Sequence, residues 1–194
     1  MRPVVLDVVK RDLCIGCGAC VVACDRKKLS IQFRDKKGDF VVIDDRTISC
    51  NCEQNLCGKV CPSLSHVDHG VQRADLWLGP FVRTYLSWAS DPELRWAGSS
   101  GGSIRAFVSH LLKARLVEGV IILCTNDTGL FPLPKLAKTP NDIEDVSNSF
   151  YLCVRFDEAM RLLSLHRTTR SAIVGLPCQI QAIRLLMKHG IVSE

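Results

Sequence analysis

Apolar and polar residues alternate on both sides of a polar turn between residues 29 and 44. In LSIQFRDKKGDFVVID the turn runs from Asp35 to Gly38, and its glycine suits the tight reversal of a β-hairpin. The pattern predicts two antiparallel strands. We expect this hairpin to cover the cysteine-rich segments that flank it in sequence.

Helical periodicity starts near residue 90. Ser90 and Glu93 have the spacing of a capping box and Pro92 falls in the first turn, so we expect a short helix here. The glycines from Gly98 to Gly102 should interrupt it. A second helix, with Gly119 at its end, is indicated by apolar residues at helical spacing: Ile104, Phe107, Val108, Leu111 and Leu112. The VIILC that follows is typical of a buried strand.

Two further strand-to-helix units are predicted near the end of the chain. SAIVGLPCQIQAIRLLMKHG begins with a short apolar strand, turns at Gly-Leu-Pro and continues as a helix with one apolar face, ending at Gly190. SFYLCVRFDEAMRLLSLHR is expected to form another such unit. Strands that alternate with helices indicate an α/β domain.

Cysteine is distributed unevenly along the 194 residues. Eight of the 11 cysteines fall in the first 61 residues, and only Cys124, Cys153 and Cys178 come later. We therefore expect a cysteine-rich α+β module over residues 1–75 and an α/β domain over residues 76–194. A disulfide framework is disfavoured, because nothing in the sequence marks the chain for export.

The remaining composition argues against nucleic acid and a membrane as partners. The formal net charge is +5, with basic runs at 26–28 and 36–37. Nucleic-acid binding is disfavoured, because such runs are typical of solvated loops and because thiolate-bound metal clusters would lower the net charge. There is no apolar run long enough to span a membrane, and MRPVVLDVVKRD has no signal-peptide core, so we expect a cytoplasmic protein.

The first cysteine motif has the spacing of bacterial-type ferredoxins. In Cys14-x2-Cys17-x2-Cys20-x3-Cys24, three close thiolates hold one 4Fe-4S cluster and the fourth reaches another. Gly16 and Gly18 would let the chain turn tightly around a cluster and direct N–H groups toward sulfur.

The second motif is less regular. It runs Cys50-x-Cys52-x4-Cys57-x3-Cys61 and is followed by Pro62, so its ending matches ferredoxins while its beginning does not. If the usual crossover applies, the first cluster has the ligands Cys14, Cys17, Cys20 and Cys61, and the second has Cys24, Cys50, Cys52 and Cys57. Zinc is the alternative, although it needs only four ligands and usually takes two separated pairs. Residues 1–75 thus resemble a two-cluster ferredoxin domain.

Two features of the α/β part are typical of binding or catalytic sites. The loop GSSGG offers free backbone N–H groups and two hydroxyls before a helix, which suits a phosphate or a flavin edge; the alternative is a flexible helix junction. Cys178 falls in the first turn of the last predicted helix, where the dipole stabilises a thiolate. It is therefore a candidate nucleophile or metal ligand, or else a small buried apolar residue.

Three stretches together resemble the coenzyme F420 hydrogenase/dehydrogenase beta-subunit family: SDPELRWAGSSGG, SNSFYLCVRFDEAM and VGLPCQIQAIR. Larger members of that family also carry an N-terminal two-cluster ferredoxin domain. The resemblance implies an FAD that connects one-electron clusters to a hydride carrier, coenzyme F420 in many members. It also implies that Cys178 binds a further cluster, and that the flavin lies near Ser99, Ser100, Gly101, Gly102, Gly175 and Pro177.

The chain departs from the family pattern in two places. Asn148-Ser149-Phe150-Tyr151 stands where the family often has Gly-Ser-Lys-Tyr, so a lysine suited to a cofactor phosphate is missing. Family members also continue well past the GLPCQI helix, into a region with further cysteines. A fragment, a split subunit and a shortened relay all agree with this ending.

Two functions agree with these observations. The first is an iron-sulfur flavoprotein oxidoreductase, or its N-terminal part, that relays electrons between clusters and FAD. Its partners would be a hydrogenase, dehydrogenase or ferredoxin, with coenzyme F420 or another reducible organic acceptor. The second is a ferredoxin-like electron-transfer subunit that docks on a larger redox complex and catalyses nothing alone. A zinc-binding interaction module is a third interpretation.

Overall fold

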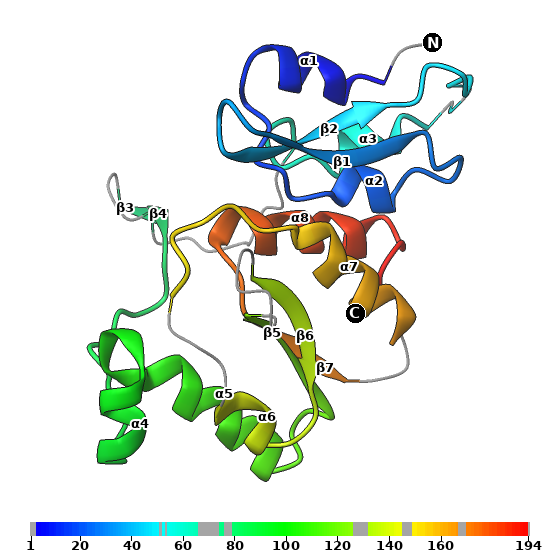
Figure 1. The fold of residues 1–194 in the computed structure, drawn as a ribbon. Helices are drawn as coiled ribbons and strands as arrows, with labels where there is room; N and C mark the ends of the chain where they lie inside the picture. Colours follow the sequence, from blue (N-terminus) through cyan, green and yellow to red (C-terminus); the bar gives the residue numbers. More distant parts are fainter. Residues whose placement is uncertain are drawn as a thin grey trace.

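The computed structural model describes residues 3–50, 52, 54–65, 74–75, 79–125, 132–144, 149–166 and 170–193. Its helices are α1 (Val5–Lys10), α2 (Ala19–Val22), α3 (Leu56–Lys59), α4 (Pro92–Ala97), the 3-10 turn η1 (Ser99–Gly102), α5 (Ser103–Lys113), α6 (Asn141–Glu144), α7 (Phe156–Leu165) and α8 (Pro177–Lys188). Its strands are β1 (Leu29–Arg34), β2 (Asp39–Asp44), β3 (Ala74–Asp75), β4 (Gly79–Pro80), β5 (Gly119–Cys124), β6 (Leu133–Ala137) and β7 (Ser171–Ile173) (Figure 1). In the described part of the chain, every helix is too short or too polar to cross a membrane.

The hairpin predicted over residues 29–44 is confirmed. β1 and β2 pair antiparallel, from Leu29 opposite Asp44 to Arg34 opposite Asp39. Leu29 and Val42 share a small core with Val5 of α1 and the side chain of Cys20. The hairpin and α1 thus enclose part of the cysteine-rich segment, as the alternation of residues predicts.

The central sheet has the strand order β6-β5-β7. β5 pairs antiparallel with β6 and parallel with β7. Val120 and Ile122 on one face of β5 share a core with residues of α5 and α6, whereas Ile121 on the other face packs with residues of α7 and α8. A strand covered on both faces is apolar at successive positions, which explains VIILC. The fold is therefore mixed α/β with small sheets.

The cap of α4 differs from the prediction. The capping side chain is Asp91 and not Ser90, and its carboxylate accepts the N–H of Glu93 at 2.9 Å. Because a carboxylate satisfies a free N–H and also meets the positive end of the helix dipole, Asp91 is an effective cap. The interruption after α4 is confirmed: Gly101 and Gly102 have φ angles of 75° and 69° in η1.

Three other elements differ from the sequence pattern. α5 ends at Lys113, and Gly119 begins β5 instead of ending the helix. Residues 149–155, which were predicted to contain a strand, have no strand pairing. β6 was not predicted. It contains Pro134, and its place at the sheet edge explains how the proline is tolerated.

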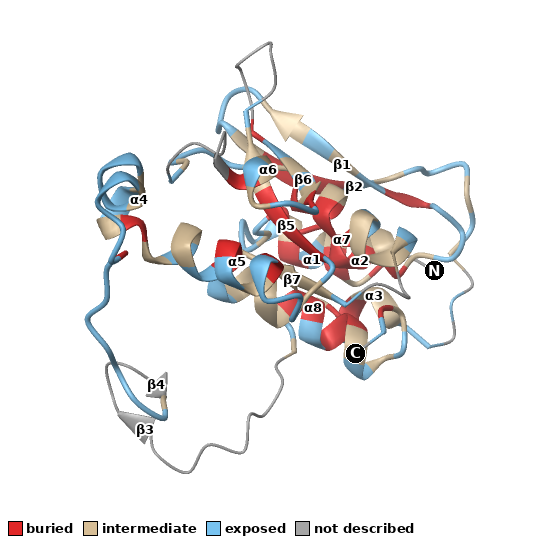
Figure 2. Cartoon of the chain, turned by 90° about the horizontal axis from the view of Figure 1, so that it is seen from below, coloured by how far each residue is buried: buried red, intermediate tan, exposed pale blue. Residues whose placement is uncertain are grey.

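One core cluster joins the cysteine-rich part to the α/β part. Figure 1 shows α2 lying against α7 and α8, with the hairpin and then α1 beyond it, and Figure 2 shows buried residues gathered where α2, α7, α8 and β5 meet. The cluster contains Cys17, Ala19, Ala23, Val60, Ile121, Phe156, Ala159, Met160, Ala182, Ile183, Leu185, Leu186 and Val192. Residues 1–75 and 76–194 therefore share a core.

Gly18 lies at the contact between the two parts and gives a direct test of it. Its φ is +76°, and a Cβ at this position would be 2.2 Å from the Cβ of Asp157 in α7. Gly38 has a similar φ of +66° but nothing within 4 Å. Alanine at either position should lower the free energy of unfolding by about 1–2 kcal/mol, because a Cβ disfavours the left-handed backbone conformation. Only Gly18→Ala must also displace α7, which should lower its free energy of unfolding by a further ~1–3 kcal/mol.

Denaturant unfolding of the Gly18→Ala and Gly38→Ala variants measures this difference. Equal losses of unfolding free energy would contradict the close packing of Gly18 on α7.

Candidate iron-sulfur centre

Four cysteines from distant parts of the sequence line a narrow cavity of about 20 Å³. These are Cys14, Cys17, Cys20 and Cys61. Cys17 and Cys20 are buried, whereas Cys14 and Cys61 are half-buried. α2 places Cys20 near its start, and the turn after α3 brings Cys61 beside it. The structure therefore brings three thiols of the first motif together with the last thiol of the second.

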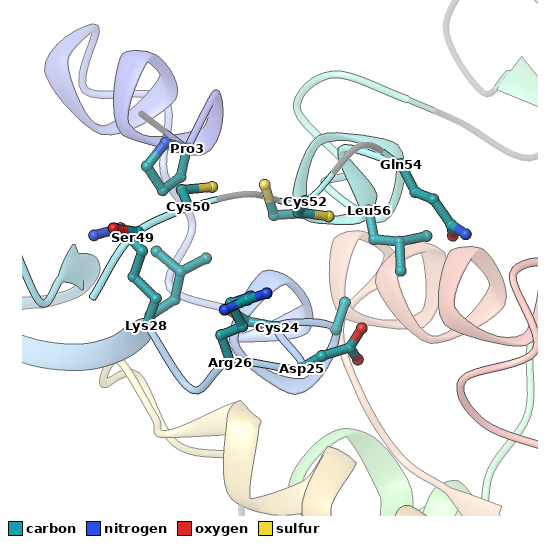
Figure 3. Close-up of a pocket in the computed structure, with 13 residues that line it drawn as sticks. Pro3, Cys24, Asp25, Arg26, Lys28, Ser49, Cys50, Cys52, Gln54 and Leu56 are labelled. Carbon is teal, nitrogen blue, oxygen red and sulfur yellow. The ribbon is translucent and has the colours of Figure 1, made fainter. Parts of the chain in front are cut away.

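The other four thiols of the two motifs line a second, larger cavity of about 530 Å³. These are Cys24, Cys50, Cys52 and Cys57, of which Cys52 is exposed. Figure 3 shows Cys50 and Cys52 on one wall, with Cys24 and Arg26 opposite. The eight thiols are thus grouped four and four, as the predicted crossover requires.

Burial sets the protonation of the inner thiols. The pKa of Cys17 is raised to about 12, mainly by burial; the Ala19 N–H opposes this shift, and the neighbouring Cys61, Cys14 and Cys178 contribute to it. Burial likewise raises the pKa of Cys20 well above its usual range. A metal centre binds thiolates, so its assembly must release these protons.

Backbone N–H groups point at the sulfurs of both groups. Burial raises the pKa of Cys61, and the N–H of Ser63 partly offsets this by lowering that pKa. The N–H of Val5 acts in the same way on Cys57, whose pKa burial also raises. Donors of this kind stabilise sulfur that carries negative charge. They therefore suit thiolates bound to a cluster.

Alkylation of the metal-free chain should separate buried from exposed thiols. Because the thiolate is the reacting species, we expect Cys17 to react with iodoacetamide at pH 8 at least about tenfold more slowly than the exposed Cys153. Raising the pH toward 12 should speed the reaction of Cys17. Mass spectrometry of the modified peptides gives both rates, and guanidinium should make them similar. Equal rates in the folded chain would contradict the burial of Cys17.

The donor set fits 4Fe-4S clusters. In such a cluster, four thiolates each bind a different iron at the corners of a cube. Across the described residues, no three His, Cys, Asp or Glu side chains converge as the ligands of one metal ion do. Two groups of four cysteines, with N–H donors to sulfur, supply the ligand type and the number that two clusters need.

Cys178 lies beside the first group of thiols. It is half-buried at the start of α8, and its charge is among those that raise the pKa of Cys17. The sequence alone does not show this, because 160 residues separate the two. The start of α8 therefore faces the first group, which makes Cys178 a neighbour of that group.

The loop predicted to approach a flavin is packed on α4. A Cβ at Gly102 would be 2.2 Å from the carbonyl oxygen of Leu94, so the need for glycine there is explained by local packing. Ser99 and Ser100 are exposed. The N–H of Ser149 donates to Oγ of Ser99 at 3.3 Å. Two of the stretches that resemble the family thus meet at this loop.

Gly175 and Pro177 lie in the turn between β7 and α8. A Cβ at Gly175 would be 3.1 Å from the ring of Phe156, and the Leu176 N–H donates to the side chain of Gln179 at 2.8 Å. Five residues, 114–118, connect α5 to β5, so the start of α5 lies toward the carboxyl end of β5. The turn before α8 follows the carboxyl end of β7, the end at which ligands bind in open α/β sheets, whereas the 99–102 loop lies at the start of α5, the helix that packs on the other face of β5.

One residue of the second cavity was missed from the sequence. The basic run at 26–28 was assigned to a solvated loop, but Lys28 is only 6% exposed and lines the cavity together with Arg26. Nothing in the local pattern marks which lysine of the run turns inward. The assignment was wrong for Lys28, while Arg26 and Lys27 are exposed as expected.

Comparison with known families agrees with the resemblance seen in the sequence. The family described as coenzyme F420 hydrogenase/dehydrogenase, beta subunit N-term, matches residues 84–161. Residues 84–161 are thus similar to the N-terminal part of that family's beta subunits. The matched residues include the 99–102 loop and most of α7, which packs against the cysteine-rich part.

Three curated relatives extend the comparison. The chain is 27% identical over 180 residues to the coenzyme F420-dependent sulfite reductase of Methanocaldococcus jannaschii, covering 93% of this chain and 26% of that protein. It is 27% identical over 197 residues to one subunit of the F(420)H(2) dehydrogenase of Methanosarcina mazei, covering 97% and 53%. It is also 44% identical over 39 residues to Ferredoxin-3 of Trichormus variabilis, covering 20% and 40%. The chain spans about half or less of the length of these relatives.

Proposed function

We propose that this chain is the electron-relay part of an iron-sulfur oxidoreductase, and that it holds two 4Fe-4S clusters. The proposed ligands are Cys14, Cys17, Cys20 and Cys61 for the first cluster and Cys24, Cys50, Cys52 and Cys57 for the second. The observation that carries the proposal is the sorting of eight thiols into two cavities of four. The ferredoxin relative and the F420-dependent relatives support it.

The residues around the thiols would hold and insulate such clusters. Val5, Val8 and Val42 line the first cavity and keep water from it. The N–H groups of Ala19, Ser63 and Val5 would donate to bound sulfur. A bound 4Fe-4S cluster accepts and releases one electron at a time. The chain itself positions the thiols and sets the charge and solvent access around them.

We also propose that FAD binds near Ser99, Ser100, Gly101, Gly102, Gly175 and Pro177. Coenzyme F420 or another reducible organic molecule would then be the hydride partner, and a further subunit would be the redox partner. The support is the family match and the names of the relatives. Cys178 would be one ligand of a further cluster, completed by residues from outside the described chain.

Anaerobic purification followed by assays of iron, acid-labile sulfide, zinc and released flavin tests the proposal. About eight irons per chain and a similar amount of sulfide are expected from two clusters. Two zinc ions and no iron would contradict it. Flavin in near-equal amount to the chain would support the FAD site.

A second candidate is a relay that catalyses nothing alone. The observation that favours it is that both large groups of thiols are assembled within this chain, whereas the serines of the proposed flavin loop are exposed. Eight irons without flavin would favour this relay over the flavoprotein.

A further inference from the structure

Lys28 is a buried cation in the wall of the cavity that contains Cys24, Cys50, Cys52 and Cys57. It is 6% exposed, and lysine is almost never buried to this degree unless it is paired. Its Nζ donates to the carbonyl oxygens of Asp45 and Ile48, both at 2.5 Å. It also lies 3.5 Å from the carboxylate of Asp44. The partners of the ammonium therefore all lie in the segment that leads into Cys50.

These bonds fix the course of residues 45–48. The N–H of Asp45 donates to the carbonyl oxygen of Lys28 at 2.8 Å, so the two residues are joined by both backbone and side chain. The Asp45 carboxylate in turn accepts the N–H of Thr47 at 2.8 Å. Cys50 follows Ile48 by two residues. Because residues 45–50 form no helix or strand, the bonds from Lys28 to Asp45 and Ile48 help to hold the approach to Cys50.

The two thiol cavities differ in charge. Apart from the thiols, the first cavity is lined by apolar residues, glycine, proline and one serine. The second is lined by Lys28, Arg26 and Asp25, and the ammonium of Lys28 is bonded in the wall of this cavity. A cluster with four thiolates carries about −2 when oxidised and about −3 when reduced. A nearby buried cation favours the more negative state, and poor screening in the interior makes its effect larger than that of an exposed lysine.

We propose that Lys28 positions Cys50 and raises the reduction potential of the cluster held by Cys24, Cys50, Cys52 and Cys57. This inference rests on the proposed function, since it requires a cluster in that cavity. Lys28 acts through the segment 45–50 and through its charge. It makes the two clusters unequal, with the second easier to reduce than it would be without the ammonium.

Redox titration of the anaerobically purified chain tests the role of Lys28. Dithionite supplies the single electron that reduces each cluster, electron paramagnetic resonance follows the reduced form, and iron is counted in the same samples. The variants are Lys28→Gln, which removes the charge, Lys28→Arg, which keeps it, and Lys27→Gln, which removes an adjacent exposed charge as the matched control.

We expect Lys28→Gln to lower one of the two midpoint potentials, with a change of at least about tenfold in the reduction equilibrium constant, which is 59 mV for one electron. Lys27→Gln should leave both potentials nearly unchanged. The midpoint potentials of Lys28→Arg should lie closer to those of the unaltered chain than the potentials of Lys28→Gln do. Loss of about four irons in Lys28→Gln alone would equally support the positioning of Cys50.

Several outcomes would overturn the inference. Eight irons and two unchanged potentials in Lys28→Gln would do so while leaving the proposed function intact. Loss of all iron in Lys28→Gln would assign Lys28 to the fold as a whole and reject a role specific to this cavity. An absence of iron in the unaltered chain would reject the proposed function and this inference together.

Discussion

Replacing Cys17 with serine should remove about four of the eight iron atoms expected per chain and bleach part of the visible absorbance. Cys17 lines the first cavity with three other cysteines and is 8% exposed. A serine hydroxyl is a far weaker ligand than a thiolate, so the four-thiol set would be incomplete. The second cavity shares none of its lining thiols with the first, so its cluster should persist. Iron and sulfide analysis with electron paramagnetic resonance measures both effects.

Cys153→Ser is the matched control for this change. Cys153 is exposed and lies in neither cavity, so its replacement should leave iron and absorbance unchanged. Unchanged iron in Cys17→Ser, or equal losses in the two variants, would contradict the ligand assignment.

Phe156→Ala should lower the free energy of unfolding by about 3–5 kcal/mol, the usual cost of removing a large aromatic side chain from a core. Phe156 is 2% exposed and belongs to the cluster shared by both parts of the chain. We therefore expect both parts to lose stability together. Circular dichroism during guanidinium unfolding measures the whole chain, and alkylation of Cys17 under the same conditions reports on the cysteine-rich part.

Phe107→Ala serves as the control because Phe107 is 63% exposed. It should change the free energy of unfolding by far less than Phe156→Ala. If alkylation of Cys17 were insensitive to Phe156→Ala while circular dichroism showed a large loss, the two parts would not depend on the shared core.

The sequence predicts elements well where a local pattern determines them. The hairpin follows from alternation around Asp35–Gly38, and α8 follows from the Gly-Leu-Pro turn with apolar residues on one face. The grouping of the eight thiols also follows, because ferredoxin spacing includes the crossover of the last cysteine of each motif. In each case the decisive residues lie close together in sequence or belong to a recurring spacing.

Other features depend on contacts that no local pattern contains. Asp91 competes with Ser90 for the cap of α4, and both residue types are good caps, so only the backbone geometry decides. β6 contains Pro134 and forms only because β5 offers an edge. Lys28 turns inward because its ammonium donates hydrogen bonds to the carbonyl oxygens of Asp45 and Ile48, some twenty residues later in the sequence. The proximity of Cys178 to Cys17 arises from packing of α2 on α8.

The shared core has a consequence for synthesis of the chain on the ribosome. Cys17 and Ala19 pack in it with Ala182 and Leu186, so Cys17 gains its full cover only after more than 160 further residues have been translated. At roughly 5–20 residues per second, that interval is about 8–32 s. During it, the nascent cysteine-rich segment is open to oxidants and also to the cell's cluster-assembly machinery. Under the proposed function, the inner site would be loaded most easily before α8 has been made, and closure of the core would then retain the cluster.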